Sequence, residues 1–180
     1  MVLLPEPEVD WTATAAELVG AGVDVLLAPG DGADSADRGA PAPTHPTGPN
    51  ADLRTVARLA TWLRQQAPGP CLVVAAGGSA RLLPALATAL RAAHRLVTAY
   101  VLVDATIPAP ASALGTAWPD APVWWVRTDP AGGSSASASE SGARADADER
   151  LARRAVAARL RGFEVVETSD VAGVVLAASR

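Results

Sequence analysis

The stretch from Cys71 to Leu86, CLVVAAGGSARLLPAL, holds the residues whose types and order could do chemistry. An apolar strand runs into a turn of small residues, and an Ala/Leu-rich helix follows the turn. A sharp strand-to-helix turn of this kind displays one side chain above a parallel sheet, where Ser, Cys or Asp would act as a nucleophile. This turn offers Ala76, Gly77 and Gly78 instead. The sequence therefore predicts the frame of a covalent catalytic site without its attacking group.

Binding chemistry remains open at the same turn. The backbone N–H groups of Gly77 and Gly78, at the start of a helix, could receive an anion or a polarised carbonyl oxygen. The alternative for both glycines is a plain tight turn. Ser79 could be a displaced nucleophile, and its alternative is the N-cap of the following helix, since Ser is a preferred cap residue. We take these three residues as candidate substrate-binding residues.

Carboxylates follow three of the predicted strands. Asp104 and Asp129 each come after an apolar strand, and Glu6 comes shortly after the first one. A carboxylate buried in a pocket can have a raised pKa and act as a general acid or base. We predict Asp104 and Asp129 as catalytic residues and Glu6 as a substrate-binding residue. The alternative for each is a carboxylate that caps a helix or braces a loop.

The aromatic residues are dominated by tryptophan, with five Trp against one Phe and one Tyr. Trp11 and Trp118 lie in segments that follow strands, and a pocket lined by both would favour a flat, apolar ligand. Ordinary packing is the alternative for each. Trp124 and Trp125 are adjacent on a predicted strand, so their side chains must lie on opposite faces of the sheet. Trp62 is expected in the core.

The elements that must position these residues are short Val/Leu strands alternating with Ala/Leu/Arg helices. This alternation predicts a single α/β domain over residues 1–180, with a mostly parallel sheet of about six strands and helices on both faces. Thr12 and Asn50 are expected as helix caps, and Leu53 on the buried stripe of its helix. The strands are predicted at 2–4, 23–28, 72–75, 97–103, 123–127 and 163–167, and the helices at 13–19, 52–66, 79–94, 146–161 and 171–178.

The connections between these elements differ in length with their direction. Those from helix to strand are short, whereas those leaving strands are long, at 29–51, 105–122 and 128–145. All strand-leaving segments of a parallel sheet lie at its carboxyl edge, where ligands of such folds bind. We expect flexible loops at 29–51 and 128–145, because the run AGGSSASASESGA at 131–143 has the composition of a linker.

Composition excludes several classes of function. The net charge is −4, and no basic stripe interleaved with aromatics points to nucleic acid. All 15 basic residues are Arg, which rules out lysine Schiff-base and Walker-type chemistry. One cysteine and two histidines give no metal cluster. No signal sequence or apolar span is evident. We expect a cytoplasmic protein that needs no metal or cofactor and has no membrane partner, and an exposed edge strand could support a homodimer.

Three segments together resemble the α/β-hydrolase superfamily, especially its actinobacterial members. Residues 72–86 resemble the family's nucleophile elbow, YVLVDATIP at 100–108 the next strand and its exit, and GFEVVE at 162–167 the last strand. The resemblance covers some two-thirds of the chain. It implies an α/β sheet whose pocket lies at the carboxyl edge, here without a cap domain.

The same resemblance implies that the catalytic machinery has been lost. Gly77 stands where the family has its nucleophile, and Thr168-Ser169-Asp170 follows the last strand where the family has His. Pro5 and Pro7 remove N–H donors from the segment that would form the oxyanion hole. Only the acid has a counterpart, Asp129.

These losses predict an enzyme that works without a covalent intermediate. The leading hypothesis is a cofactor-independent cyclase or pericyclase of specialised metabolism that holds an apolar, polyketide-like substrate in a reactive shape. The alternative is a non-catalytic small-molecule-binding or interaction protein on a decayed hydrolase scaffold. A third, weaker hypothesis is a rebuilt hydrolase with Ser79 or an Asp as nucleophile.

Overall fold

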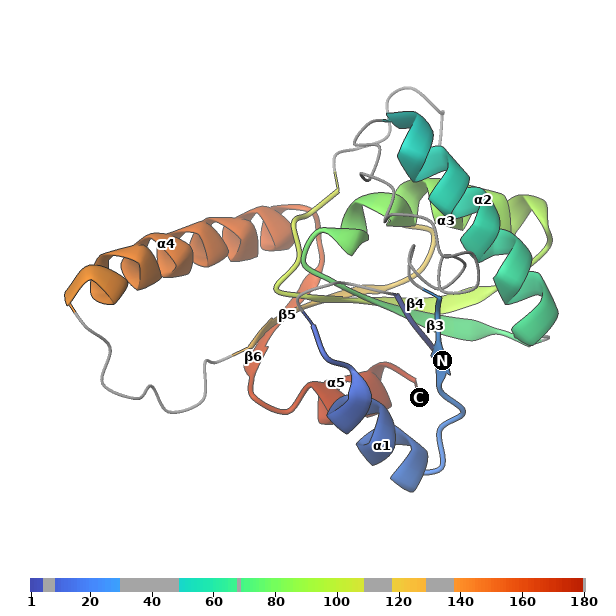
Figure 1. The fold of residues 1–180 in the computed structure, drawn as a ribbon, viewed down its shortest axis with the longest axis horizontal. Coiled ribbons are helices and arrows are strands. Elements are labelled where there is room, and N and C mark those ends of the chain that lie inside the picture. The colour runs from blue at the N-terminus through green and yellow to red at the C-terminus, as the bar shows by residue number, and fades with distance from the viewer. Residues whose placement is uncertain (5–8, 30–48, 68, 109–117, 129–137, 180) are drawn as a thin grey trace, which may run out of the picture.

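The fold is a single parallel sheet with helices on both of its faces (Figure 1). The structure is a computed structural model, and it describes residues 1–4, 9–29, 49–67, 69–108, 118–128 and 138–179. Its six strands lie in the order β2-β1-β3-β4-β5-β6, and every neighbouring pair is parallel. The predicted α/β class is confirmed. The strands are β1 Val2–Leu3, β2 Leu26–Leu27, β3 Cys71–Ala76, β4 Val97–Val103, β5 Val123–Thr128 and β6 Glu164–Thr168.

The helices divide between the two faces according to the direction in which the chain moves. The step from β1 to β2 runs one way along the sheet, and all later steps run the other way. Because crossovers between parallel strands are right-handed, the two directions put their helices on opposite faces. One face carries α2, the 3₁₀ turn η1, α3 and α4, and the other carries α1 and α5 (Figure 1). The elements are α1 Thr12–Gly20, α2 Pro49–Gln66, η1 Ser79–Leu82, α3 Leu83–Ala92, α4 Ala138–Leu160 and α5 Val171–Ala178.

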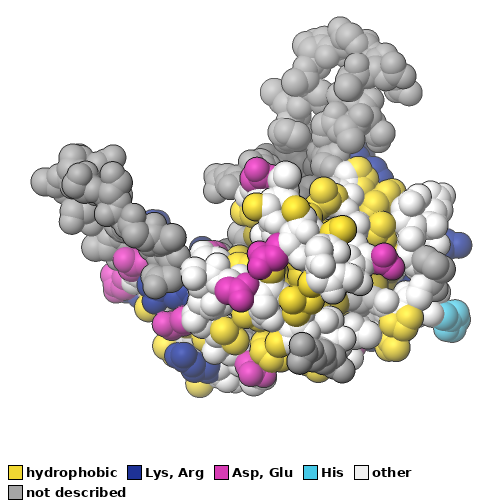
Figure 2. All heavy atoms as spheres, turned by 90° about the horizontal axis from the view of Figure 1, so that it is seen from below, with side chains coloured by type: hydrophobic (Ala, Val, Ile, Leu, Met, Phe, Trp, Pro, Cys, Tyr) yellow, Lys and Arg dark blue, Asp and Glu magenta, His cyan; other side chains and the backbone are white. Residues whose placement is uncertain are grey.

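The core consists of two apolar layers separated by the sheet. All six residues of β3 are buried, because this strand has a partner on each side and helices above and below. Val73 and Ala75 face α2 and α3, whereas Val74 and Ala76 face α1 and α5. A strand covered on both faces reads as a continuous apolar run instead of an alternating one. On the α1/α5 face, acidic side chains lie among hydrophobic ones at the surface (Figure 2).

Several local predictions are wrong. Asn50 lies inside α2, which begins at Pro49, and Leu53 is 52% exposed instead of facing the core. No side chain caps α1 at its N-cap residue Trp11, and the N–H of Thr12 binds the carboxylate of Asp10 over 2.9 Å.

The helix predicted at 146–161 begins earlier, at Ala138. The last part of the predicted linker at 131–143 is therefore helical, since Ala138, Glu140 and Ala143 lie in it and favour a helix. The predicted loop at 128–145 is likewise helical from Ala138 onwards. Most of the predicted loop at 29–51 lies outside the described residues.

A polar network holds the segment that leads into β5. The hydroxyl of Tyr100 donates to Asp120 over 2.8 Å, and the guanidinium of Arg91 pairs with the same carboxylate over 2.8 Å. Partial burial acts to raise the pKa of the Asp120 carboxyl, but the hydrogen bonds from Arg91 and Tyr100 outweigh it, so that the pKa lies below its usual value. Burial, together with the bond to Asp120, raises the pKa of Tyr100, which keeps its phenol protonated as the donor.

We predict that Asp120→Asn lowers the free energy of unfolding at pH 7 by about 1 kcal/mol, because a partly buried charge pair is lost. A carboxyl whose pKa is depressed in the folded state contributes stability above its unfolded pKa and loses it as pH falls. The difference from the unmodified protein should therefore shrink below about pH 4. Urea unfolding at pH 7 and pH 3 measures it.

The matched control is Glu164→Gln at an exposed position on β6, which should change stability by less than about 0.5 kcal/mol at pH 7. An Asp120→Asn protein as stable as the control at pH 7 would contradict the role of the network.

Candidate functional site

The topology places a candidate site at the carboxyl edge of the sheet, between β1 and β3. The chain moves from β1 outward to β2 and then returns to β3 on the other side of β1, so the strand order reverses there. Ligands of open parallel sheets bind outside the carboxyl ends of the strands at such a switch point. The described residues that end these strands are Leu4 and the turn from Gly77 to Ser79.

The turn after β3 is tied to the neighbouring strand by its backbone. Gly77 has a φ of +50°, a conformation in which a side chain is strained. Its N–H donates to the carbonyl of Val103 over 3.1 Å, and its carbonyl accepts from the N–H of Thr106 over 3.2 Å. The expectation that both glycines offer N–H groups to a ligand is therefore wrong for Gly77. Gly78 is exposed and has ordinary helical dihedrals, with a φ of −78°.

Ser79 is turned into the protein. Its side chain is 3% exposed, and its hydroxyl donates to the carbonyl of Ala76 over 2.7 Å. The residue also does not cap the following helix, because Gly78 holds the N-cap position of η1 and no side chain makes the capping bond. Both the nucleophile and the N-cap interpretations thus differ from the contacts observed. Ser79 therefore stabilises the turn through its hydrogen bond to Ala76.

Asp104 braces the carboxyl ends of β4 and β5. Its φ is +46°. One carboxylate oxygen accepts from the N–H of Thr128 over 3.0 Å, and the other accepts from the hydroxyl of the same residue. Its own carbonyl accepts from Arg154 of α4 over 3.2 Å. These are the contacts of the bracing alternative, and an acid–base role for Asp104 stays a prediction.

The tryptophans do not form the expected pocket. Trp11 is buried on the α1/α5 face, where its indole N–H donates to the carbonyl of Leu4 over 3.1 Å. Trp118 lies on the opposite face and packs edge-on against Tyr100 and Phe163, with ring centroids 5.9 and 5.8 Å away. A pocket lined by both is wrong, because the sheet separates them.

The other three tryptophans, Trp62, Trp124 and Trp125, lie on α2 and β5. Trp124 and Trp125 belong to opposite faces of β5, which confirms the strand argument. Trp62 packs against the core from a partly buried position.

Two predicted residues, Glu6 and Asp129, lie outside the described residues. The sequence reasoning missed Arg81, whose guanidinium pairs with Asp52 over 3.1 Å and donates to the carbonyl of Gly78 over 2.9 Å. Its position two residues after Ser79, in the first turn after the strand, was the available signal. Arg81 thus ties the start of α2 to the turn after β3.

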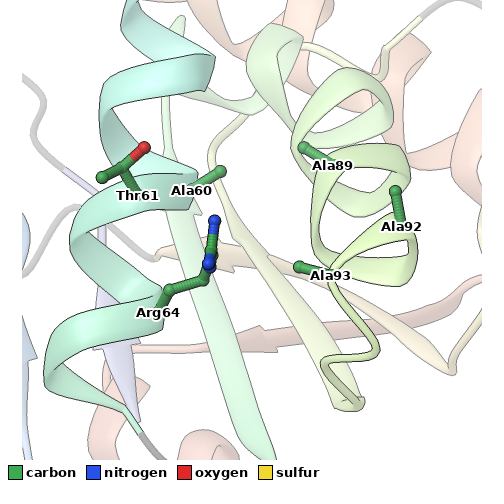
Figure 3. A pocket seen from close by; sticks show the side chains of 6 residues that line it. All are labelled: Ala60, Thr61, Arg64, Ala89, Ala92 and Ala93. Carbon is green, nitrogen blue, oxygen red and sulfur yellow. The ribbon is translucent and has the colours of Figure 1, made fainter.

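A second feature is a groove between α2 and α3, which the sequence reasoning also missed. It has a volume of about 390 Å³ and is lined by Ala60, Thr61, Arg64, Ala89, Ala92 and Ala93. The methyl groups of Ala60, Ala89 and Ala93 point into the space between the helices, and Arg64 extends into it (Figure 3). Small residues at helical spacing on α3 were the available signal, since they leave room beside a neighbouring helix.

Within the part of the chain that the structure describes, His, Cys, Asp and Glu residues do not gather into a group of three that could hold a metal ion. None of the described helices combines the length and the apolar character needed to cross a membrane. Comparison of the chain with protein-family models, with curated proteins and with solved structures finds no match. The resemblance to α/β-hydrolases therefore stays a prediction.

The bracing role of Asp104 leads to a stability prediction. Thr128→Val keeps the branched shape that suits a strand but removes the hydroxyl that donates to the Asp104 carboxylate. We expect the free energy of unfolding to fall by about 1–2 kcal/mol, because an acceptor at a partly buried carboxylate loses its partner. Guanidinium-induced unfolding measures the change.

Thr98→Val is the matched control, since Thr98 is exposed on β4. It should lie within about 0.5 kcal/mol of the unmodified protein. Equal stability of the two variants would mean that Asp104 does not hold β5.

Proposed function

We propose that this chain is a non-catalytic small-molecule-binding domain whose ligand sits at the carboxyl edge, beside the turn after β3. One observation carries the proposal: among the described residues, the two candidates for covalent or acid–base chemistry at this edge, Ser79 and Asp104, are already engaged within the protein. The hydroxyl of Ser79 is bound to Ala76, and the Asp104 carboxylate is bound to Thr128. The turn itself offers backbone and glycine in place of reactive side chains.

The location rests on the strand order. The switch point between β1 and β3 leaves a crevice at the carboxyl edge in open parallel sheets. Two sides of this edge are fixed by contacts within the protein. Gly77 is bound to Val103 of β4 and to Thr106 after that strand, and Arg81 links the turn to Asp52 of α2. A preformed edge loses little entropy when a ligand binds.

An apolar ligand suits the chemistry of this edge. Gly78 is exposed without a side chain, and Ile107, the residue after the Thr106 that binds Gly77, is partly buried. Small and aliphatic groups of this kind accept flat apolar surface, and a few backbone groups set its orientation. In this proposal the resemblance to α/β-hydrolases extends to the frame and not to the reaction.

Cyclisation of a bound polyene is the second candidate for the same edge. It needs no nucleophile, because holding the substrate in a reactive shape can itself lower the barrier. A general acid would have to come from a carboxylate other than Asp104 while Asp104 remains bound to Thr128. The contacts of the described residues therefore favour binding without acid–base chemistry.

The proposal predicts that Gly78→Trp weakens binding of the uncharged apolar probe N-phenyl-1-naphthylamine at least about tenfold. Gly78 has a φ of −78°, so a side chain there causes no backbone strain, and an indole would fill the edge. Fluorescence titration measures the dissociation constant.

Gly20→Trp is the matched control, because an added Cβ there meets no atom within 4 Å and the residue ends α1, away from this edge. It should bind the probe as the unmodified protein does. Two results would overturn the proposal: equal affinity in both variants, or release of chemically altered product from a polyene incubated with the protein. The second result would favour the cyclase.

A further inference from the structure

Strand β6 forms one edge of the sheet. Among the strands that the structure describes, it pairs only with β5, and none of its five residues is fully buried. The other edge strand, β2, has only two residues. An edge strand presents a row of backbone N–H and C=O groups that can pair with a strand of another chain. The edge at β6 is therefore the longer template for association.

Helix α4 carries exposed apolar side chains along this same edge. It packs on β5 and β6, yet Val156 and Leu160 are 55% and 84% exposed. On its inner side, Arg154 donates to the carbonyl of Asp104, the residue after β4. Val156 follows Arg154 by two residues, which is about 200° around the helix. Val156 and Leu160 therefore face away from β4, toward the space beyond β6.

We propose that β6 and α4 form the interface of a homodimer, in which the β6 strands of two copies pair antiparallel. The two-fold axis of such a pair runs perpendicular to the sheet, because this rotation reverses the strand direction and keeps each face on its own side. Both α4 helices then lie on the same face of one continuous sheet. Because α4 packs on β5 and β6, its axis lies about 5 Å from the two-fold axis. The two helices are then about 10 Å apart, the distance at which helices pack.

The order of residues along β6 suits this antiparallel pairing. Full overlap of the strand Glu164–Thr168 puts Val166 on the two-fold axis. Glu164 then lies opposite the partner's Thr168, and Val165 opposite the partner's Glu167. Like charges directly opposite each other would destabilise the pair, and this register keeps the carboxylates apart.

The surface is also complementary to itself in charge. Val165 faces the α4 side, and Glu167, two residues later on the strand, faces the same side. The partner's Glu167 therefore reaches the beginning of β6 on that side. Arg159 is exposed there, since the N–H of Gly162 donates to its carbonyl over 2.9 Å and holds it next to the strand. Each copy thus offers an arginine to the other copy's glutamate, as a two-fold interface requires.

The apolar residues of α4 complete the contact. Ala152, Val156 and Leu160 follow each other at intervals of one turn and are all exposed. They span about 12 Å of the helix, beside a strand about 17 Å long. In an antiparallel pair of helices, Val156 meets its counterpart at the axis and Leu160 packs on the partner's Ala152. This interface lies at the far end of the sheet from the turn after β3, and it does not depend on the function proposed there.

The experiment is sedimentation equilibrium of the full chain, which should show a dimer at about 100 μM. Leu160→Gln should raise the dissociation constant at least about tenfold, because the leucine becomes buried only between copies. The variant should fold normally, since Leu160 is 84% exposed in a single copy. Val19→Gln is the matched control, because Val19 is 58% exposed on α1, away from β6. It should leave the dissociation constant unchanged.

Charge reversal tests the antiparallel register. Arg159→Glu and Glu167→Arg should each raise the dissociation constant about five- to tenfold, because two ion pairs become like-charge pairs. The double variant keeps the net charge of the chain and should restore the dissociation constant to within about twofold.

Three results would overturn the proposal: a monomer at this concentration, equal effects of Leu160→Gln and Val19→Gln, or a double variant that associates no better than the single ones. Gly78→Trp should form the dimer as the unmodified protein does, which separates this result from the carboxyl-edge proposal.

Discussion

The complete burial of β3 is the constraint on which the rest of the structure depends. Its six residues are covered by β1, β4 and the helices of both faces. A buried backbone must satisfy its hydrogen bonds, so the strands on either side are fixed with it. The chain leaves this strand through Gly77, whose positive φ and two hydrogen bonds, to Val103 of β4 and to Thr106 after it, set the shape of the carboxyl edge. Packing therefore determines what the edge can offer a ligand.

The fold could be predicted from the sequence because its signal is strong and repeated. Apolar runs without alternation, as in CLVVAA, indicate strands buried on both faces, and their alternation with helices indicates a parallel sheet. The opposite placement of Trp124 and Trp125 followed from strand geometry alone. The boundaries of the elements were harder to predict. Helix α4 begins at Ala138, within a stretch whose Ser and Gly content predicted a linker, because helix-favouring residues extend into that stretch.

The site was predicted less well, because side-chain direction depends on tertiary contacts. Ser79 satisfies its hydroxyl on Ala76, and Asp104 satisfies its carboxylate on Thr128 of the next strand. The spacing of residues along the sequence does not predict the contact between Asp104 and Thr128. Trp11 and Trp118 were both placed after strands, yet the sheet lies between them. The groove beside Arg64 arises from two helices brought together by β3 and β4.

The central claim is that the carboxyl edge holds a ligand without reacting with it. Amide hydrogen exchange, measured with and without saturating N-phenyl-1-naphthylamine, tests this most directly, since it reports protection residue by residue. We predict slower exchange at Gly78 and Thr106, beside the turn after β3, with the probe recovered unchanged. Protection confined to other elements, with unaltered exchange at these two residues, would contradict the account.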